Sequence, residues 1–203
     1  MKKLDKLVVA SNNKGKIKEI KNILSKLPLD VVSLEDMGVK SSVEEDGETF
    51  EENAFKKALE IYKILGSKHM VLADDSGLMV DVLNGAPGVY SARFAGEHGN
   101  DKKNNEKLLK MLESKENRKA KFVCSMVLIY RNKVIKVNGE VEGNIIKETR
   151  GANGFGYDPL FYIPEYNMTF AEMDSSIKNN ISHRAKALNK ILKEITKLIQ
   201  GEK

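Results

Sequence analysis

Apolar positions form two kinds of pattern in the first half of the chain, short runs and helical spacing, and these predict alternating strands and helices. Short continuous apolar runs at residues 7–10 and 31–34 are typical of buried strands. Residues 16–27 and 50–65 carry apolar side chains three and four positions apart, which predicts two amphipathic helices. The second helix would begin after Thr49, whose hydroxyl can form a capping box with the side chain three residues on.

A different pattern marks the second half of the chain. Residues 122–130 and 134–141 are apolar runs separated by three polar residues, which predicts a β-hairpin. Residues 84–99 are rich in glycine and are expected to form a structured loop before a helix over residues 100–113. Ser182 would cap a final amphipathic helix. Alternating strands and helices followed by a hairpin indicate an α/β fold with a mixed sheet.

Composition narrows the class of protein further. A chain of 203 residues with 41% hydrophobic and 31% charged residues suits one globular domain or two closely joined lobes. The net charge of +5 favours anionic partners such as nucleotides, nucleic acid or phosphate groups, and the dispersed lysines give a nucleic-acid footprint only weak support. The single cysteine, Cys124, cannot form an internal disulfide, and no apolar segment has the length of a membrane span. We therefore expect a cytoplasmic protein.

Two adjacent carboxylates, Asp74 and Asp75, are the first candidates for chemistry. They directly follow the apolar run 70–73, so we expect them at the end of a buried strand, where α/β enzymes place their active sites. Paired carboxylates favour a bound divalent cation because they repel each other without a counter-ion. The alternative is an acidic turn that only caps the strand.

The turn between the first strand and the first helix is a candidate phosphate site. It offers a hydroxyl, two amides, backbone N–H groups and ammonium groups at a helix start. The spacing is not that of a Walker loop. Capping of the helix is the structural alternative. The residues of this turn are Ser11, Asn12, Asn13, Lys14, Gly15 and Lys16.

Further charged groups could join these two sites. Glu44 and Glu45 precede Gly47 and a helix that carries Lys57, so acids and an ammonium group would converge if this turn faces Asp75. A solvated charge run is the alternative. The sequence leaves open which of the two glutamates faces a metal.

Two later segments offer aromatic and cationic groups. Phe155, Gly156, Tyr157 and Asp158 place rings beside a glycine, so an exposed ring could stack on a base; ordinary packing is the alternative.

Lys178, His183 and Arg184 lie near the start of the final helix. Cations at a helix N-terminus are mildly unfavourable for stability, which favours a role in binding an anion or a base carbonyl.

These segments occur in an order that resembles the Ham1-like family of inosine and xanthosine triphosphate pyrophosphatases. The resemblance spans nearly the whole chain and implies a single domain over residues 1–203, made of two lobes of an elongated mixed α/β fold with a nucleotide cleft between them. It also implies a Mg²⁺ requirement and usually a homodimer. The matching segments are residues 11–16, 45–58, 73–78, 85–96, 155–161 and 182–184.

The resemblance implies an activity and a role for each site. The enzyme would hydrolyse ITP, dITP and XTP to the monophosphate and pyrophosphate, and so remove non-canonical purine nucleotides that would otherwise enter DNA and RNA. Asp75 would be the central acid and would bind Mg²⁺ with Glu45. Residues 11–16, Lys57 and Lys178 would hold the triphosphate.

The resemblance also implies a purine site. Phe155 would stack on the purine, while His183 and Arg184 would donate hydrogen bonds to its 6-oxygen. The other substrate-binding residues would be Ser76, Gly156, Tyr157 and Asp158. The ranking of the substrates and the rejection of GTP stay open, and no stable nucleic-acid or membrane partner is expected.

Two rival functions remain possible at this point. A Maf-like nucleotide pyrophosphatase shares the general architecture but has a serine- and arginine-rich opening that is absent here. A non-catalytic nucleotide-binding module would suit the net positive charge. Such a module would leave Glu45, Asp74 and Asp75 unexplained beside an anion site, whereas a metal-dependent hydrolase accounts for them.

Overall fold

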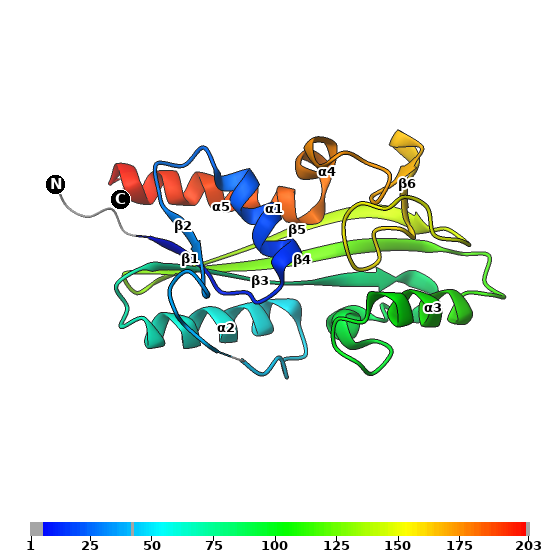
Figure 1. Cartoon of the computed structure of the whole chain (residues 1–203), viewed down its shortest axis with the longest axis horizontal. Helices are drawn as coiled ribbons and strands as arrows, with labels where there is room; N and C mark the ends of the chain where they lie inside the picture. Colours follow the sequence, from blue (N-terminus) through cyan, green and yellow to red (C-terminus); the bar gives the residue numbers. More distant parts are fainter. Residues whose placement is uncertain (1–5, 42, 202–203) are drawn as a thin grey trace. The chain divides into compact units, whose positions relative to one another are not determined.

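A mixed sheet of seven strands organises the part of the chain, residues 6–41 and 43–201, that the computed structural model describes. The strand order is β2-β1-β3-β4-β5-β6-β7 (Figure 1). The strands are β1 (Leu7–Val9), β2 (Val31–Ser33), β3 (Met70–Val80), β4 (Lys119–Tyr130), β5 (Lys133–Ile145), β6 (Phe161–Ile163) and β7 (Met168–Thr169). The helices are α1 (Lys14–Leu24), α2 (Phe50–Ile64), α3 (Asp101–Met111), α4 (Ser175–Ile181) and α5 (His183–Gln200). The predicted α/β class with a mixed sheet is confirmed.

The described chain divides into two compact units. Unit 1 consists of the residues up to Asp75, Cys124–Gly139 and the residues from Arg184 on; unit 2 consists of Ser76–Val123 and Glu140–His183. Strands β3, β4 and β5 each supply residues to both units. The cleft that the resemblance implies stays a prediction.

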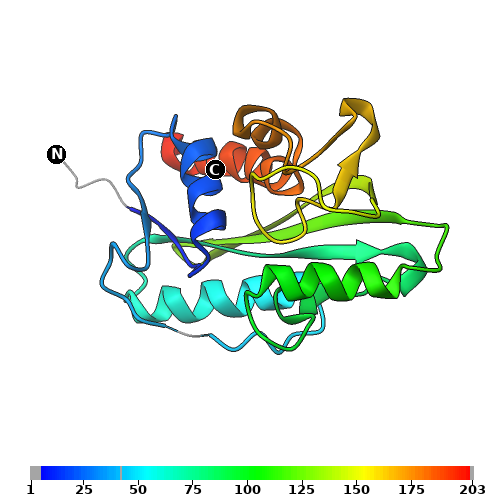
Figure 2. The same ribbon diagram turned by 45° about the vertical axis from the view of Figure 1, so that its right-hand side comes forward.

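Parallel pairing of short apolar strands builds the core of unit 1. Strand β1 pairs in parallel with both β2 and β3, with Val8 opposite Val32 and Val71. Helices α1 and α5 lie on one side of these strands and α2 lies on the other (Figures 1 and 2). Because both faces are covered, β1 and the first four residues of β3, residues 70–73, are apolar on both faces, which explains these continuous runs in the sequence.

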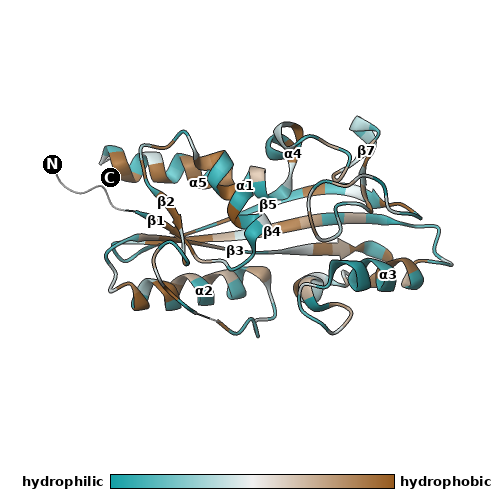
Figure 3. Ribbon diagram, in the orientation of Figure 1, coloured by the Kyte–Doolittle hydropathy of each residue, from teal (hydrophilic) through white to brown (hydrophobic). Residues whose placement is uncertain are grey.

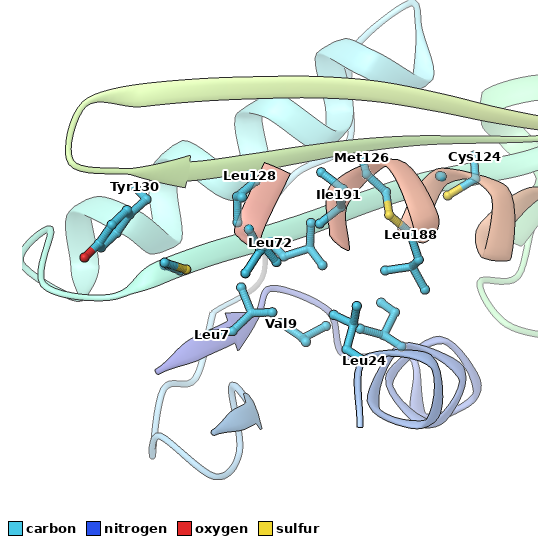
Figure 4. Packing of buried hydrophobic residues seen from close by; sticks show 14 residues of the cluster. Leu7, Val9, Leu24, Leu72, Cys124, Met126, Leu128, Tyr130, Leu188 and Ile191 are labelled. Atoms are coloured by element: carbon cyan, nitrogen blue, oxygen red, sulfur yellow. The ribbon is translucent and has the colours of Figure 1, made fainter. Parts of the chain in front are cut away.

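Strand alternation separates the two apolar layers of unit 1. Successive side chains of a strand point to opposite faces. Leu7, Val9 and Leu72 therefore pack with α1 and α5 residues such as Leu188 (Figure 4), whereas Val71 and its alternate neighbours pack with α2. Helices α1, α2 and α5 each carry hydrophobic and hydrophilic bands (Figure 3), as their helical periodicity predicts.

Unit 2 has an aromatic core of its own. The ring centroids of Phe122 and Phe161 lie 4.6 Å apart, and those of Phe161 and Phe170 lie 5.2 Å apart. Leu108 and Leu112 pack into the same cluster and attach α3 to it. The cluster gives unit 2 a core built from residues that unit 1 does not share.

Several predicted elements are confirmed with small shifts in their ends. Helix α2 begins after Thr49, and the capping box with Glu52 is present. The hairpin is longer than predicted, with a two-residue turn in which Arg131 and Asn132 have φ values of 47° and 63°. Such left-handed turns match the twist of adjacent strands. The loop over residues 84–99 contains the 3₁₀ segment Gly88–Arg93.

The prediction that a strand ends before Asp74 is wrong. Strand β3 continues to Val80: the acids themselves are buried, and Leu78 and Val80 beyond them pack in the core of unit 2. Its neighbour β1, however, ends at Val9, which pairs with Leu72. The two acids therefore lie beyond the carboxyl end of β1 although they lie inside β3.

The sequence patterns also missed three short elements. Helix α4 has seven residues, of which only Ile177 and the last, Ile181, are large apolar ones, so no amphipathic period could reveal it. Strands β6 and β7 have three and two residues. Among the described residues, no helix is both long enough and apolar enough to cross a bilayer.

The packing of α5 generates a test of stability. Ile191 is fully buried in the cluster between α5 and the strands of unit 1, so Ile191→Ala should reduce the free energy of unfolding by about 2–5 kcal/mol. Lys193 is exposed on the same helix, and Lys193→Ala should change it by less than about 0.5 kcal/mol. Urea unfolding followed by circular dichroism measures both; equal effects would contradict this packing.

Candidate active site

The predicted site residues fall into two groups, one in each unit. Unit 1 contains Asp75, Glu45, Lys57, Arg184 and the turn of residues 11–16. Unit 2 contains the remaining predicted residues, which are Ser76, Phe155, Gly156, Tyr157, Asp158, Lys178 and His183.

Asp74 lies in a buried network of charges. Its side chain faces the α1 and α5 side of β3, where its Oδ2 atom lies 3.2 Å from Lys16 Nζ and 3.4 Å from Arg184 Nη2. Burial to 1% exposure would raise its pKa, but Lys16, Arg184 and Lys57 outweigh that effect and hold the pKa well below its ordinary value. The carboxylate form of Asp74 is therefore favoured, and its ion pairs join β3 to two helices.

Arg184 belongs to the same network. Its guanidinium also pairs with Glu19 on α1. Burial to 1% exposure lowers the pKa of Arg184, but Asp74 and Glu19 more than compensate and raise it above its ordinary value. Sequence reasoning missed Glu19, whose only signal was its position one helical turn after Lys16. The predicted contact of Arg184 with a purine stays a prediction.

Asp75 points to the opposite face of β3, toward α2. Its Oδ2 atom accepts a hydrogen bond of 3.0 Å from Asn53 Nδ2, and its Oδ1 atom lies 4.0 Å from Lys57 Nζ. Burial raises its pKa above the ordinary value, although Lys57 and Lys16 oppose the rise. The environments of the two adjacent acids thus push their pKa values in opposite directions, as in pairs that divide acid and base roles.

Lys57 brings a second carboxylate toward Asp75. Its Nζ atom donates a 2.7 Å hydrogen bond to Glu45 Oε1. Burial would raise the pKa of Glu45, but Lys57 lowers it below the ordinary value. Glu44, in contrast, is exposed. The geometry therefore favours Glu45 as the acid that faces Asp75.

The carboxylates around Lys57 suit a metal ion whose other ligands come from a bound substrate. Among the described residues, no group of three or more His, Cys, Asp or Glu side chains is arranged to hold a metal ion. Glu45 and Asp75 nevertheless flank the same ammonium group. Proteins usually hold Mg²⁺ with one or two carboxylates and the substrate's phosphates rather than a complete protein cage, so this pair fits Mg²⁺.

The turn of residues 11–16 has both structural and candidate binding features. Asn13 Oδ1 accepts a 3.0 Å hydrogen bond from the backbone N–H of Lys16, so Asn13 caps α1, which begins earlier than predicted. Ser11 Oγ accepts from the backbone N–H of Asn13 at 3.2 Å, and Asn12 donates to the backbone of Ser41. The turn thus holds the positive N-terminal end of an eleven-residue helix near Lys16 and Asp74.

In unit 2, Asp158 organises the loop that carries Phe155. Its Oδ2 atom accepts hydrogen bonds from the backbone N–H of Phe155 at 2.9 Å and from Lys178 Nζ at 2.6 Å. Lys178 Nζ also lies 5.0 Å from the centroid of the Phe155 ring. A Cβ atom at Gly154, whose φ is +79°, would lie 2.0 Å from Asp158 Oδ2, so this turn requires glycine.

Hydrogen bonds to α3 and to the 3₁₀ segment hold the residues next to Phe155 in place. Tyr157 is buried, and its hydroxyl donates a 2.8 Å hydrogen bond to the backbone oxygen of Ser91. Gly156 donates from its N–H to Asp101 Oδ2 at 2.7 Å and accepts from Asn105 Nδ2 at 3.0 Å. Sequence reasoning missed Asp101 and Asn105, because helix positions 55 and 51 residues away carry no local signal.

His183 is buried in the aromatic core of unit 2. Its ring stacks on Phe122 with centroids 4.7 Å apart and an interplanar angle of 12°. This contact fixes the ring plane at the start of α5. The predicted role of His183 as a donor to a purine stays a prediction.

Comparisons with known proteins agree with the resemblance seen in the sequence. A model of the Ham1 family matches residues 7–194. A protein of Clostridium tetani named dITP/XTP pyrophosphatase is 58% identical over 198 residues, which cover 97% of this chain and 98% of the relative. A protein of the same name from Clostridium perfringens is 55% identical and covers 93% and 96%.

Solved structures give the same result. The Ham1 protein of Staphylococcus aureus has a TM-score of 0.83 at 42% identity, and the match covers 98% of this chain and 100% of that one. A HAM1 protein of Coxiella burnetii has a TM-score of 0.86 at 39% identity, covering 96% and 100%. The chain therefore belongs to the Ham1 family.

Proposed function

We propose that this protein is a nucleoside-triphosphate pyrophosphatase that hydrolyses non-canonical purine nucleotides, namely dITP, ITP and XTP. The observation that carries the proposal is the arrangement in unit 1 of Asp75, Glu45 and Lys57 with the capped start of α1. Relatives more than half identical over nearly their whole length are named dITP/XTP pyrophosphatase. Removal of these nucleotides would keep them out of DNA and RNA.

Asp75 is the proposed catalytic base. Burial raises the pKa of its carboxyl, which makes the carboxylate a better proton acceptor than an exposed aspartate. It would orient a water molecule and accept its proton as the water oxygen attacks. The bond between the α and β phosphates would break, leaving the nucleoside monophosphate and pyrophosphate.

The cations of unit 1 would stabilise the triphosphate. Lys16 and Lys57 would offset the charge that develops on the leaving pyrophosphate, and the N–H groups at the start of α1 would donate to phosphate oxygens. Lys178 would add positive charge, although its contacts with Asp158 and Phe155 favour a role at the purine end. Ser11, Asn12 and the other residues of the turn would also help to hold the triphosphate.

Mg²⁺ is the proposed cofactor. When bound by Glu45 and Asp75 with the nucleotide, it would neutralise negative charge on the phosphates. Lys57 would then hold Glu45 in place through the 2.7 Å hydrogen bond described above.

The loop of unit 2 is the proposed purine site. Phe155 would stack on the base, and its backbone is fixed by Asp158. His183 and Arg184 would donate to the 6-oxygen of the purine. Adenine carries an amine there, which offers these donors no acceptor, and sites of this kind discriminate by roughly 10⁴ or more. We further propose a homodimer in the cytoplasm.

The release of pyrophosphate from a panel of nucleotides tests the function. With Mg²⁺, we expect release from dITP, ITP and XTP, much less from ATP and dTTP, and none after chelation. Preference for dTTP would indicate a Maf-like specificity. Binding without release from any nucleotide would contradict the proposed activity and favour the non-catalytic module.

Substitution of the proposed base gives a sharper prediction. Asp75→Asn removes the proton acceptor with little change in shape, so kcat should fall at least about 10²-fold at saturating Mg²⁺. Asp46→Asn is the matched control, because Asp46 is an exposed acid that pairs only with Lys56 among the contacts described. Steady-state kinetics should show near-normal turnover for the control; normal turnover for Asp75→Asn would refute the assignment.

The stacking role of Phe155 predicts a loss of binding. Stacking of a base on an aromatic ring contributes about 1–3 kcal/mol, so Phe155→Ala should lower kcat/KM for ITP by roughly 5- to 150-fold. Tyr166→Ala removes an exposed ring from the same unit and should have no such effect. An unchanged KM for ITP in Phe155→Ala would place the purine elsewhere.

A further inference from the structure

Asn53 on α2 joins two parts of the site in unit 1 through one side chain. It is fully buried, with 0% exposure. Its Nδ2 atom donates a 3.0 Å hydrogen bond to Asp75 Oδ2, and its Oδ1 atom accepts a 2.8 Å hydrogen bond from the backbone N–H of Gly47. The carboxamide thus bridges the proposed base and the loop that carries Glu45.

Only a carboxamide of this length satisfies both partners. Asp75 needs a donor and the Gly47 N–H needs an acceptor, and the asparagine side chain supplies one of each. An ionised aspartate would keep the acceptor but lose the donor, and alanine would lose both. Buried polar groups left without partners are costly, so this position constrains its residue type strongly.

Gly47 is shaped to receive this contact. A Cβ atom there would lie 2.7 Å from Asn53 Oδ1 and 2.9 Å from Glu52 Cβ. At Gly47 the backbone therefore approaches α2 more closely than a residue with a side chain would allow. Two residues earlier, Glu45 bonds to Lys57, which lies one helical turn after Asn53 on α2. The acidic loop is thus attached to one helix face at two successive turns.

We propose that Asn53 is a positioning residue for the reaction. It holds one oxygen of Asp75 so that the other faces Lys57, and it fixes Gly47 so that Glu45 reaches the same ammonium group. This inference rests on the proposed function, because it gives Asp75 and Glu45 their roles as base and metal ligands. Asn53 acts through these residues and does not touch the substrate.

Two substitutions separate the two arms of the side chain. Asn53→Ala loses both hydrogen bonds, whereas Asn53→Asp retains an acceptor for Gly47 and presents a carboxylate to Asp75. We expect kcat for ITP to fall by about 10- to 100-fold in both, because small misplacements of catalytic groups have effects of this size. The KM for ITP and the ratio of ITP to ATP hydrolysis should change much less, since Asn53 does not face the nucleotide.

Thr49→Ala is the matched control for a merely structural role. It removes the hydroxyl that caps α2 through a 3.1 Å hydrogen bond to the N–H of Glu52, and it leaves both contacts of Asn53 in place. We expect a lower melting temperature with kcat within about twofold of the unsubstituted protein, because loss of a cap destabilises the helix only. A fall in kcat equal to that of Asn53→Ala would overturn the proposal.

Hydrogen exchange of the Gly47 amide, followed by NMR, tests the geometry without any turnover. The amide should be protected in the unsubstituted protein, in Thr49→Ala and in Asn53→Asp, and should exchange at least about tenfold faster in Asn53→Ala, in which its acceptor is lost. Normal kcat in both Asn53 variants, or unchanged protection in Asn53→Ala, would refute the positioning role. Failure of every nucleotide to release pyrophosphate would instead refute the proposed function, with the exchange result still deciding the contact.

Discussion

Charge compensation around the buried carboxylate of Asp74 is the constraint on which unit 1 depends. Moving an ion out of water costs several kcal/mol, and this cost is met only where opposite charges lie close. Lys16 comes from α1 and Arg184 from α5, so both helices must dock correctly on β3 before the anion is neutralised. Loss of one partner from such a network typically costs about 3–5 kcal/mol, because the remaining charge stays buried. The network therefore favours one arrangement of these three elements.

The pleat of β3 turns this structural constraint into chemistry. Because consecutive side chains alternate between faces, fixing Asp74 toward α1 and α5 forces Asp75 toward α2. There it meets Lys57 at 4.0 Å and the amide of Asn53, with burial as the dominant influence on its pKa. The pKa of one acid is lowered by two close cations, and the pKa of the other is raised because its burial is less fully compensated. Two identical residues thus acquire different properties from a single strand.

The sequence predicted much of the fold because its signals were local. A short apolar run located β1, helical periodicity located α1 and α2, and the residues around Thr49 located a cap. The strand end before Asp74 was mispredicted because polarity was taken as the end of a strand, whereas polar residues here continue an extended backbone beyond the end of β1. Helix α4 was not predicted because seven residues are too few to show a helical period.

The candidate site was less accessible to sequence reasoning, for a physical reason. Chemical type and order indicated Asp75, Lys57 and Glu45, but the partners that orient them come from distant positions. Glu19 and Asn53 lie on helix faces that look ordinary in the sequence, and only tertiary packing brings them to Arg184 and Asp75. Pairwise contacts of this kind cannot be read from a residue's neighbours along the chain.

The sequence separation within the Asp74 network has a consequence for biosynthesis. Asp74 and Arg184 are 110 residues apart, so a ribosome that has completed β3 has not yet made the guanidinium that compensates its buried acid. Chains fold as they emerge, but this part of unit 1 must remain open until α5 has been translated. Pauses or truncations before that point would leave a carboxylate that Lys16 compensates without the help of Arg184 and an exposed apolar layer for chaperones or proteases to recognise. The long sequence separation of this ion pair thereby makes folding of the proposed catalytic unit dependent on late translation.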